Sequence, residues 1–143
     1  MWCSVRSRRS PSGSIATAEF ASVSTRIGTD LIELARIVRA LEHPGFRDRC
    51  FTAAEQVYCE SRANPAESYA ARFCGKEAVG KALGCGVRFT WKEIEIVGRP
   101  KPGVALSGKT LAFAEKVGLQ AIDVSLTHSR TLASAVCVVE LAH

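Results

Sequence analysis

The stretch NPAESYAARFCGKEAVGKALG, residues 64–84, contains the clearest helix signals in the chain. Asn64 is a favourable N-cap, Pro65 suits the first helical position, and Glu67 places an acid in the first turn. Gly84 is a natural helix stop. The stretch therefore predicts one long helix, the third along the chain.

This predicted helix contains two glycines and a charged pair that helix formation alone does not explain. Gly75 and Gly80 each cost about 1 kcal/mol relative to alanine, which indicates that another chain or a ligand comes close there. Glu77 and Lys81 are four residues apart and share one face; an ordinary surface pair of this kind would be worth a few tenths of a kcal/mol. The loop 84–86, Gly-Cys-Gly, follows at once, and its backbone N–H groups could hold phosphate oxygens.

The segments on either side predict a mixture of helices and strands. Residues 25–30 read as the end of a strand and residues 30–41 as a helix with one apolar face. A capping box at residues 52–55 opens a second, short helix. Further elements are expected downstream: strands at 91–97, 104–107, 122–127 and 132–141, the last two forming an antiparallel hairpin, and a helix at 108–117. Because no strict βαβ rhythm is present, the fold class is α+β.

The composition of the chain limits the classes of function that it could have. With 143 residues and 47% hydrophobic content, one domain with a packed core is expected. The net charge is +5, but residues 1–26 hold four arginines against one acid, so the remainder is not a strongly basic nucleic-acid binder. No apolar run approaches the roughly 18 residues of a membrane helix. Six cysteines without metal-ligand spacing fit reduced thiols in a cytoplasmic protein.

The first residues differ from the rest in composition. Residues 1–22 are rich in serine and arginine and poor in apolar periodicity. We expect them to form a disordered or targeting-like extension, with the folded domain at residues 23–143.

The segment GVALSGKT, residues 103–110, matches the pattern of an ATP-binding phosphate loop. Pro100 and Pro102 precede it, although prolines cannot sit in the central strand that such a loop follows. Residues 104–106 read as a strand, and too few residues follow to complete a nucleotide-binding domain. We therefore interpret the match as accidental and Lys109 as a residue on a solvated helix face.

Two short motifs flank the long helix. In Gly28-Thr-Asp30 the carboxylate of Asp30, taken alone, is explained as the N-cap of the next helix, with Glu33 three residues on. Val124-Ser-Leu-Thr-His128 places an imidazole where a strand runs into a turn, and a lone histidine is usually structural or merely exposed. Neither motif predicts a function by itself.

Taken together, the motifs resemble one family, the holo-acyl-carrier-protein synthases, which are the small class of 4′-phosphopantetheinyl transferases. The resemblance spans residues 26–141. It rests on these motifs, in this order: Gly28-Thr-Asp30 with Arg36, RFCGKEAVGKA (72–82), GCG (84–86), RPKP (99–102) and DVSLTH (123–128). The chain departs from the family pattern at Cys74-Gly75, at Gly80 and at Asp123, where histidine is common.

The resemblance implies an antiparallel sheet packed with a long helix, in a homotrimer with sites at the subunit interfaces. It implies transfer of 4′-phosphopantetheine from coenzyme A to a serine of an acyl carrier protein, with release of 3′,5′-ADP, in fatty acid or polyketide biosynthesis. The catalytic residues would be Asp30, Glu77 and Lys81. Asp30 and Glu77 would bind Mg²⁺, with Mn²⁺ as the alternative, since carboxylates are the hard ligands that these ions take.

Further binding residues follow from the same resemblance. The expected coenzyme A contacts are Arg72, Lys76, Lys81, Gly84, Gly86 and His128. Arg36 and Arg39, three residues apart and off the apolar stripe, would dock an acidic carrier protein, although such a pair could also be a solvated face. Two groups could remove the serine proton: a water bound to the metal ion, or Glu77 acting through a water.

Two other functions are compatible with parts of the sequence. A binding module could hold coenzyme A or a carrier protein without transfer, and the complete set of Asp30, Glu77 and Lys81 argues against it. A nucleotide hydrolase would depend on Lys109 and be indifferent to Glu77. No nucleic-acid or membrane partner is expected.

Overall fold

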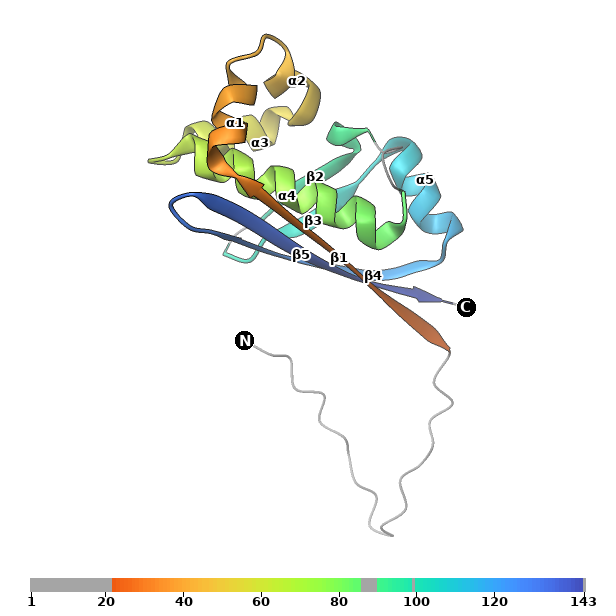
Figure 1. The fold of residues 1–143 in the computed structure, drawn as a ribbon. Coiled ribbons are helices and arrows are strands. Elements are labelled where there is room, and N and C mark those ends of the chain that lie inside the picture. Colours follow the sequence, from red (N-terminus) through yellow and green to blue (C-terminus); the bar gives the residue numbers. More distant parts are fainter. Residues whose placement is uncertain (1–21, 86–89, 99, 143) are drawn as a thin grey trace.

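One long helix lies across a three-stranded antiparallel sheet (Figure 1). The computed structural model describes residues 22–85, 90–98 and 100–142. Its elements are β1 (Val23–Glu33), α1 (Leu34–Leu41), α2 (Phe46–Cys50), α3 (Ala53–Glu60), α4 (Pro65–Leu83), η2 (Trp91–Glu93), β2 (Ile94–Val97), β3 (Gly103–Leu106), α5 (Gly108–Lys116), β4 (Leu119–His128) and β5 (Leu132–Ala142). The α+β class is confirmed.

The long helix α4 is the predicted one, but it is the fourth helix along the chain and not the third, because α2 was not predicted. It begins with Asn64 at the N-cap and Pro65 at the first position, and it ends at Gly84, whose φ of 82° is the left-handed conformation that glycine favours. Twelve of its 19 residues are buried, so it is the centre of the core rather than a surface helix. Short helices α1–α3 lie at one end of it, and the β2–β3 hairpin lies alongside (Figure 1).

Two glycines allow close packing against α4: one lets β1 approach the helix, and the other lets side chains of β2 and β4 do so. A Cβ on Gly28 of β1 would lie 1.9 Å from the carbonyl oxygen of Ala78 and 2.6 Å from the nitrogen of Ala82. A Cβ on Gly75 would lie 3.0 Å from the side chains of both Ile96 and Leu126. The close approach expected at Gly75 is therefore made by the chain itself.

The sheet has the order β1-β5-β4, with β5 in the middle. One face of β5 is buried beneath α4: Ala133, Ala135, Cys137, Val139 and Leu141. The hairpin predicted from the last two apolar runs is confirmed, because β4 and β5 pair antiparallel. No described element covers the opposite face of the sheet (Figure 1). Several large apolar side chains are exposed there: Val23, Ile27, Leu31, Leu132 and Val136.

The first helix begins later than predicted. β1 continues to Glu33, so Asp30 and Leu31 lie in the strand and α1 starts at Leu34. The prediction failed because β1 pairs with β5 along its whole length, and those main-chain bonds outweigh the helical spacing of the apolar residues. Asp30 is consequently not a helix N-cap.

The smaller elements follow the sequence closely. Thr52 and Glu55 form the predicted capping box at the start of α3. Residues 91–93 are a 3₁₀ turn rather than the first part of a strand, and β2 begins at Ile94. All five described cysteines are buried and free.

Two expectations concern the ends of the chain and membranes. Residues 1–21 lie outside the described residues, and the division at residue 22 stays a prediction. Among the residues that are described, no helix has the length and apolar character that crossing a membrane requires.

Candidate active site

Two carboxylates and one ammonium group meet between β1 and α4. Asp30 is on the face of β1 that packs against α4, and Glu77 and Lys81 are one turn apart on α4. The Lys81 Nζ atom lies 2.9 Å from Asp30 Oδ1 and 2.8 Å from the carbonyl oxygen of Thr29. The structure thus brings together three residues from motifs that are about 50 positions apart.

The charges at this site are unbalanced around Glu77. Burial raises the pKa of Glu77, the negative charge of Asp30 raises it further, and Lys81 opposes both effects. A carboxylate beside a second carboxylate in a partly buried place favours a nearby cation. The ammonium group of Lys81 is half exposed and already pairs with Asp30, so one acid of the pair remains without a full counter-charge.

This pair of acids fits a hard divalent cation. Both donors are carboxylate oxygens, which such ions prefer. In the described part of the chain no cluster of three or more acidic, histidine or cysteine side chains could enclose a metal. The two acids therefore suit an ion that keeps several waters or shares phosphate oxygens, and do not suit a closed structural site.

A buried thiol lies beside this pair and was missed by the sequence interpretation. Burial raises the pKa of Cys74 to about 12, and the charge and hydrogen bond of Asp30 add to that effect. The thiol is also 3.4 Å from the carbonyl oxygen of Ala133. Cys74 is therefore a neutral neighbour of Asp30 and not a nucleophile.

A second group of polar residues lines a cleft on the other side of α4. The cleft has a volume of about 530 Å³ and contains Arg62, Arg72 and His128 in its wall, together with Glu67. Arg72 is only 6% exposed, and its Nε atom is a buried donor with no hydrogen-bond partner in the described part of the chain. His128 is about half exposed, with Nδ1 at 3.7 Å from Glu67 Oε2.

Within residues 22–85, 90–98 and 100–142, Arg72 has an aromatic partner and no acidic one. Its guanidinium carbon lies 3.6 Å from the centre of the Tyr58 ring. Arg62 lies 5.7 Å from the same ring. The sequence interpretation named neither Tyr58 nor Arg62, because a tyrosine in a short helix and an arginine in a loop have no spacing that marks a site. Three side chains that are or can become cationic thus surround one cleft, which suits an anionic ligand.

The structure contradicts the prediction that Lys76 contacts a ligand. Its side chain is fully buried, and its Nζ lies 2.7 Å from Glu55 Oε2. The same nitrogen donates to the carbonyl oxygens of Trp91 at 3.0 Å and Ile94 at 2.6 Å. Burial lowers the pKa of Lys76, while Glu55 raises it. With three donors satisfied inside the core, Lys76 joins α3, α4 and β2, and no donor remains for a phosphate.

The remaining predicted residues are only partly described. Gly84 is the left-handed residue that ends α4, and Arg26 donates to the carbonyl oxygen of Leu83 beside it at 3.4 Å. Gly86 lies outside the described residues, so the proposed phosphate-holding loop is not seen in full.

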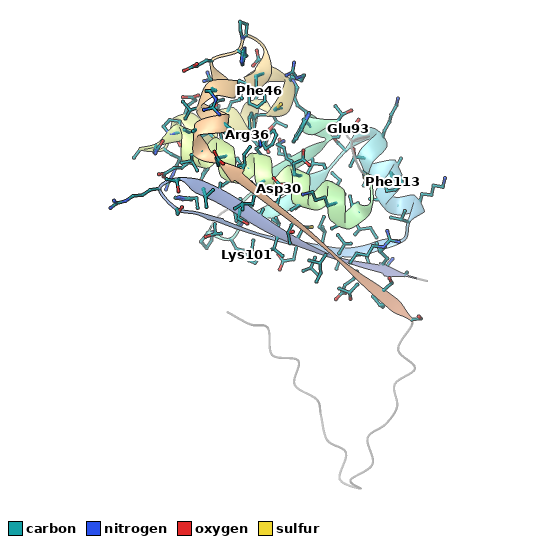
Figure 2. The ribbon with its side chains drawn as sticks, in the orientation of Figure 1. Asp30, Arg36, Phe46, Glu93, Lys101 and Phe113 are labelled. Carbon is teal, nitrogen blue, oxygen red and sulfur yellow. The ribbon has the colours of Figure 1, made fainter. Side chains whose placement is uncertain are left out.

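Arg36 and Arg39 are both exposed on α1, with Val38 exposed between them. Figure 2 shows Arg36 at the end of the molecule where α1–α3 lie, a short distance along the chain from Asp30. A basic and partly apolar surface therefore lies on α1, the element that directly follows the strand carrying Asp30.

The phosphate-loop match at residues 103–110 is occupied by the chain's own carboxylate. Glu93 accepts hydrogen bonds from the backbone nitrogens of Lys109 at 3.2 Å and Thr110 at 3.0 Å, and from the Thr110 hydroxyl at 2.7 Å. These are the amide groups that a phosphate would use at a helix N-terminus. β3 and α5 form where predicted, so the match is accidental, as expected.

Comparisons with known proteins show the family to which the chain belongs. Residues 26–137 match the sequence profile of the 4′-phosphopantetheinyl transferase superfamily. The holo-[acyl-carrier-protein] synthase of Ruminiclostridium cellulolyticum is 48% identical over 122 residues, covering 80% of this chain and 91% of the relative.

Solved structures give the same result. The holo-[acyl-carrier-protein] synthase of Neisseria meningitidis superposes with a TM-score of 0.72 at 28% identity, covering 80% of this chain and 96% of that one. The Helicobacter pylori enzyme in complex with coenzyme A gives a TM-score of 0.69 at 29% identity, covering 79% and 98%. The chain belongs to the 4′-phosphopantetheinyl transferase superfamily.

Proposed function

We propose that this protein transfers 4′-phosphopantetheine from coenzyme A to a serine hydroxyl of an apo acyl carrier protein, with release of 3′,5′-ADP. The observation on which this rests most is the meeting of Asp30, Glu77 and Lys81 between β1 and α4. Relatives named holo-[acyl-carrier-protein] synthase, at up to 48% identity over most of the chain, support the same reaction.

Asp30 and Glu77 would hold Mg²⁺, with Mn²⁺ as a substitute. A bound divalent ion supplies positive charge against the diphosphate of coenzyme A. Lys81 adds a point charge one turn along α4, and its half-exposed ammonium group can move from Asp30 to a phosphate oxygen. Most of the catalysis of phosphoryl transfer comes from positioning and charge, which these three side chains provide.

Arg72 and His128 would bind phosphate oxygens of coenzyme A in the cleft. The unpartnered Nε of Arg72 is a buried donor that a phosphate oxygen would satisfy. Arg72 also has no carboxylate in ion-pair contact within the part of the chain described here. The prediction for Lys76 is withdrawn, since its donors are used inside the core.

The two groups of residues lie on opposite sides of α4. Asp30 and Leu126 both pair with Ala135, from opposite sides of β5, so their backbones are roughly 10 Å apart. Leu126 and His128 line the cleft, while Asp30 faces the other edge of the sheet. Because α4 itself is roughly 10 Å wide, one coenzyme A molecule would contact both groups most simply across two copies of the chain.

We infer that the active form is a homotrimer with sites at its subunit interfaces. The uncovered sheet face exposes Ile27 and Leu31, each more than 60% exposed, and such a face is usually buried by a partner. Arg36 and Arg39 would dock the acidic carrier protein next to Asp30. A cytoplasmic location stays a prediction.

The proposed reaction is tested by weighing the carrier protein. The protein is incubated with coenzyme A, Mg²⁺ and apo carrier protein, and the carrier is analysed by intact-mass spectrometry. We expect a gain of one phosphopantetheine group with the wild type and none with Asp30→Ala. No gain with any divalent ion, despite tight coenzyme A binding, would mean that the chain is a binding module.

Lys109 and Glu77 separate the reaction from nucleotide hydrolysis. Transfer should be unaffected by Lys109→Ala and abolished by Glu77→Ala. ATP turnover that depends on Lys109 and not on Glu77 would support a hydrolase instead.

A further inference from the structure

Tyr58 occupies an unusual position in the wall of the cleft. Its ring lies 3.6 Å from the guanidinium carbon of Arg72, which is within stacking distance. Two hollows border this pair, the cleft of about 530 Å³ and a second of about 270 Å³. Of the residues that the structure describes, both hollows are lined by Tyr58, Arg72 and Gly98. The stacked pair therefore lies where the two hollows meet.

Arg72 is a buried arginine, 6% exposed, whose Nε has no acceptor among the described residues. No ion pair with a described carboxylate fixes the plane of its guanidinium group. The Tyr58 ring, with its centre 3.6 Å from the guanidinium carbon, is in a position to hold this plane.

Stacking on a ring uses the face of a guanidinium group and leaves its N–H groups free. An arginine held this way can therefore present its donors as a fork to phosphate oxygens. A ring in place before the ligand arrives also reduces the ordering cost of binding. Arg62 approaches the same ring at 5.7 Å, so it is the second group that a change at Tyr58 would affect.

We propose that Tyr58 is a positioning residue for coenzyme A binding, which acts by holding the guanidinium group of Arg72 towards the phosphates in the cleft. This inference rests on the proposed function, since it assumes that a coenzyme A phosphate is the anion bound. It assigns the role to the aromatic ring of Tyr58 and not to its hydroxyl group.

The test compares Tyr58→Phe with Tyr58→Leu. The first keeps the ring and should retain coenzyme A affinity within about twofold. The second removes the ring and should weaken coenzyme A binding, measured by isothermal titration calorimetry, by about 3- to 30-fold, the range expected for loss of a cation–π contact. The Michaelis constant for coenzyme A should rise by the same factor, with kcat nearly unchanged. Val57→Ala, at a neighbouring residue that is 73% exposed, is the matched control on α3.

A double-mutant cycle distinguishes an effect through Arg72 from a general loss of structure. In an Arg72→Gln background, Tyr58→Leu should cause little further loss of affinity, because the group that it positions is gone. In an Arg62→Gln background its effect should persist. A full additive loss in both backgrounds, or equal effects of Phe and Leu at position 58, would overturn the inference.

Failure of the inference and failure of the proposed function give different results. If the wild type neither binds coenzyme A nor modifies the carrier protein, the proposed function is wrong. If the wild type does both and Tyr58→Leu binds coenzyme A as tightly, only the role of Tyr58 is wrong. If Arg72→Gln does not fold, the role of Tyr58 is still tested by comparing Tyr58→Phe with Tyr58→Leu. The test is then whether Tyr58→Leu raises the Michaelis constant for coenzyme A while kcat stays nearly unchanged.

Discussion

Replacing Gly28 with alanine should separate the acidic pair without altering any of its side chains. The added Cβ would lie 1.9 Å from the carbonyl oxygen of Ala78, on the backbone of α4. An ordinary contact needs about 3.4 Å, so β1 and α4 would have to move apart by roughly 1.5 Å. Asp30 is two residues along β1, and Glu77 is one residue before Ala78, so this shift acts directly on the distance between the two carboxylates.

Two effects of Gly28→Ala can be estimated. Overpacking of this kind typically costs about 1–3 kcal/mol of folding free energy. Misplacement of catalytic groups by about 1 Å can cost roughly 100-fold in rate. We therefore expect kcat/KM for carrier modification to fall by about 100-fold, in a protein that still unfolds cooperatively in urea.

Gly103→Ala is the matched control for this experiment. Its Cβ would meet only Val97 atoms at 3.8 Å, an ordinary contact. Activity and stability should both be close to those of the wild type. Wild-type activity in Gly28→Ala would contradict this prediction, because it would mean that activity does not depend on the spacing between β1 and α4.

Further outcomes follow from other contacts. Lys76→Met should lower the free energy of unfolding by about 3–5 kcal/mol in urea titrations, because it leaves the Glu55 carboxylate buried without its cation; a loss under 1 kcal/mol would contradict this. Hydrogen bonds from the Thr110 hydroxyl and the first amides of α5 lower the pKa of Glu93, so its stabilising effect is present above its unfolded value near 4.5 and lost as pH falls through the lower folded value. The urea midpoint of Glu93→Gln should therefore lie below that of the wild type at pH 7, and the gap should close in acid. Removing Arg36 and Arg39 together should raise the Michaelis constant for the carrier protein by about 5- to 30-fold, from two exposed ion pairs of roughly 0.5–1 kcal/mol each, and leave that for coenzyme A unchanged. An increase in the Michaelis constants for both the carrier protein and coenzyme A would contradict a role of these arginines in carrier docking alone.

Local sequence signals were sufficient to predict those helices whose ends are set by particular residues. Pro65 and Gly84 mark the two ends of α4 because each has a backbone geometry suited to that place. The capping box at Thr52 is a purely local arrangement, so it was predicted correctly. The start of α1 was not, because β1 continues to Glu33 through pairing with β5, about 100 residues further along the chain.

The residues of the site were harder to assign than its position. The motifs gave Asp30, Glu77 and Lys81, which the fold brings together. The resemblance assigned Lys76, like Glu77, to ligand binding, but neighbouring residues on a helix point about 100° apart. Lys76 consequently faces Glu55 in the core. Tyr58 could not be found from sequence, because its role depends on a contact with Arg72 on another helix.

The claim on which the whole account depends is that Asp30 and Glu77 bind one divalent ion together. Titration of Mn²⁺ followed by electron paramagnetic resonance, in the presence of coenzyme A, measures this directly. The account predicts one bound Mn²⁺ per chain in the wild type and an affinity at least about tenfold lower in both Asp30→Asn and Glu77→Gln. Wild-type Mn²⁺ affinity in either variant would contradict it.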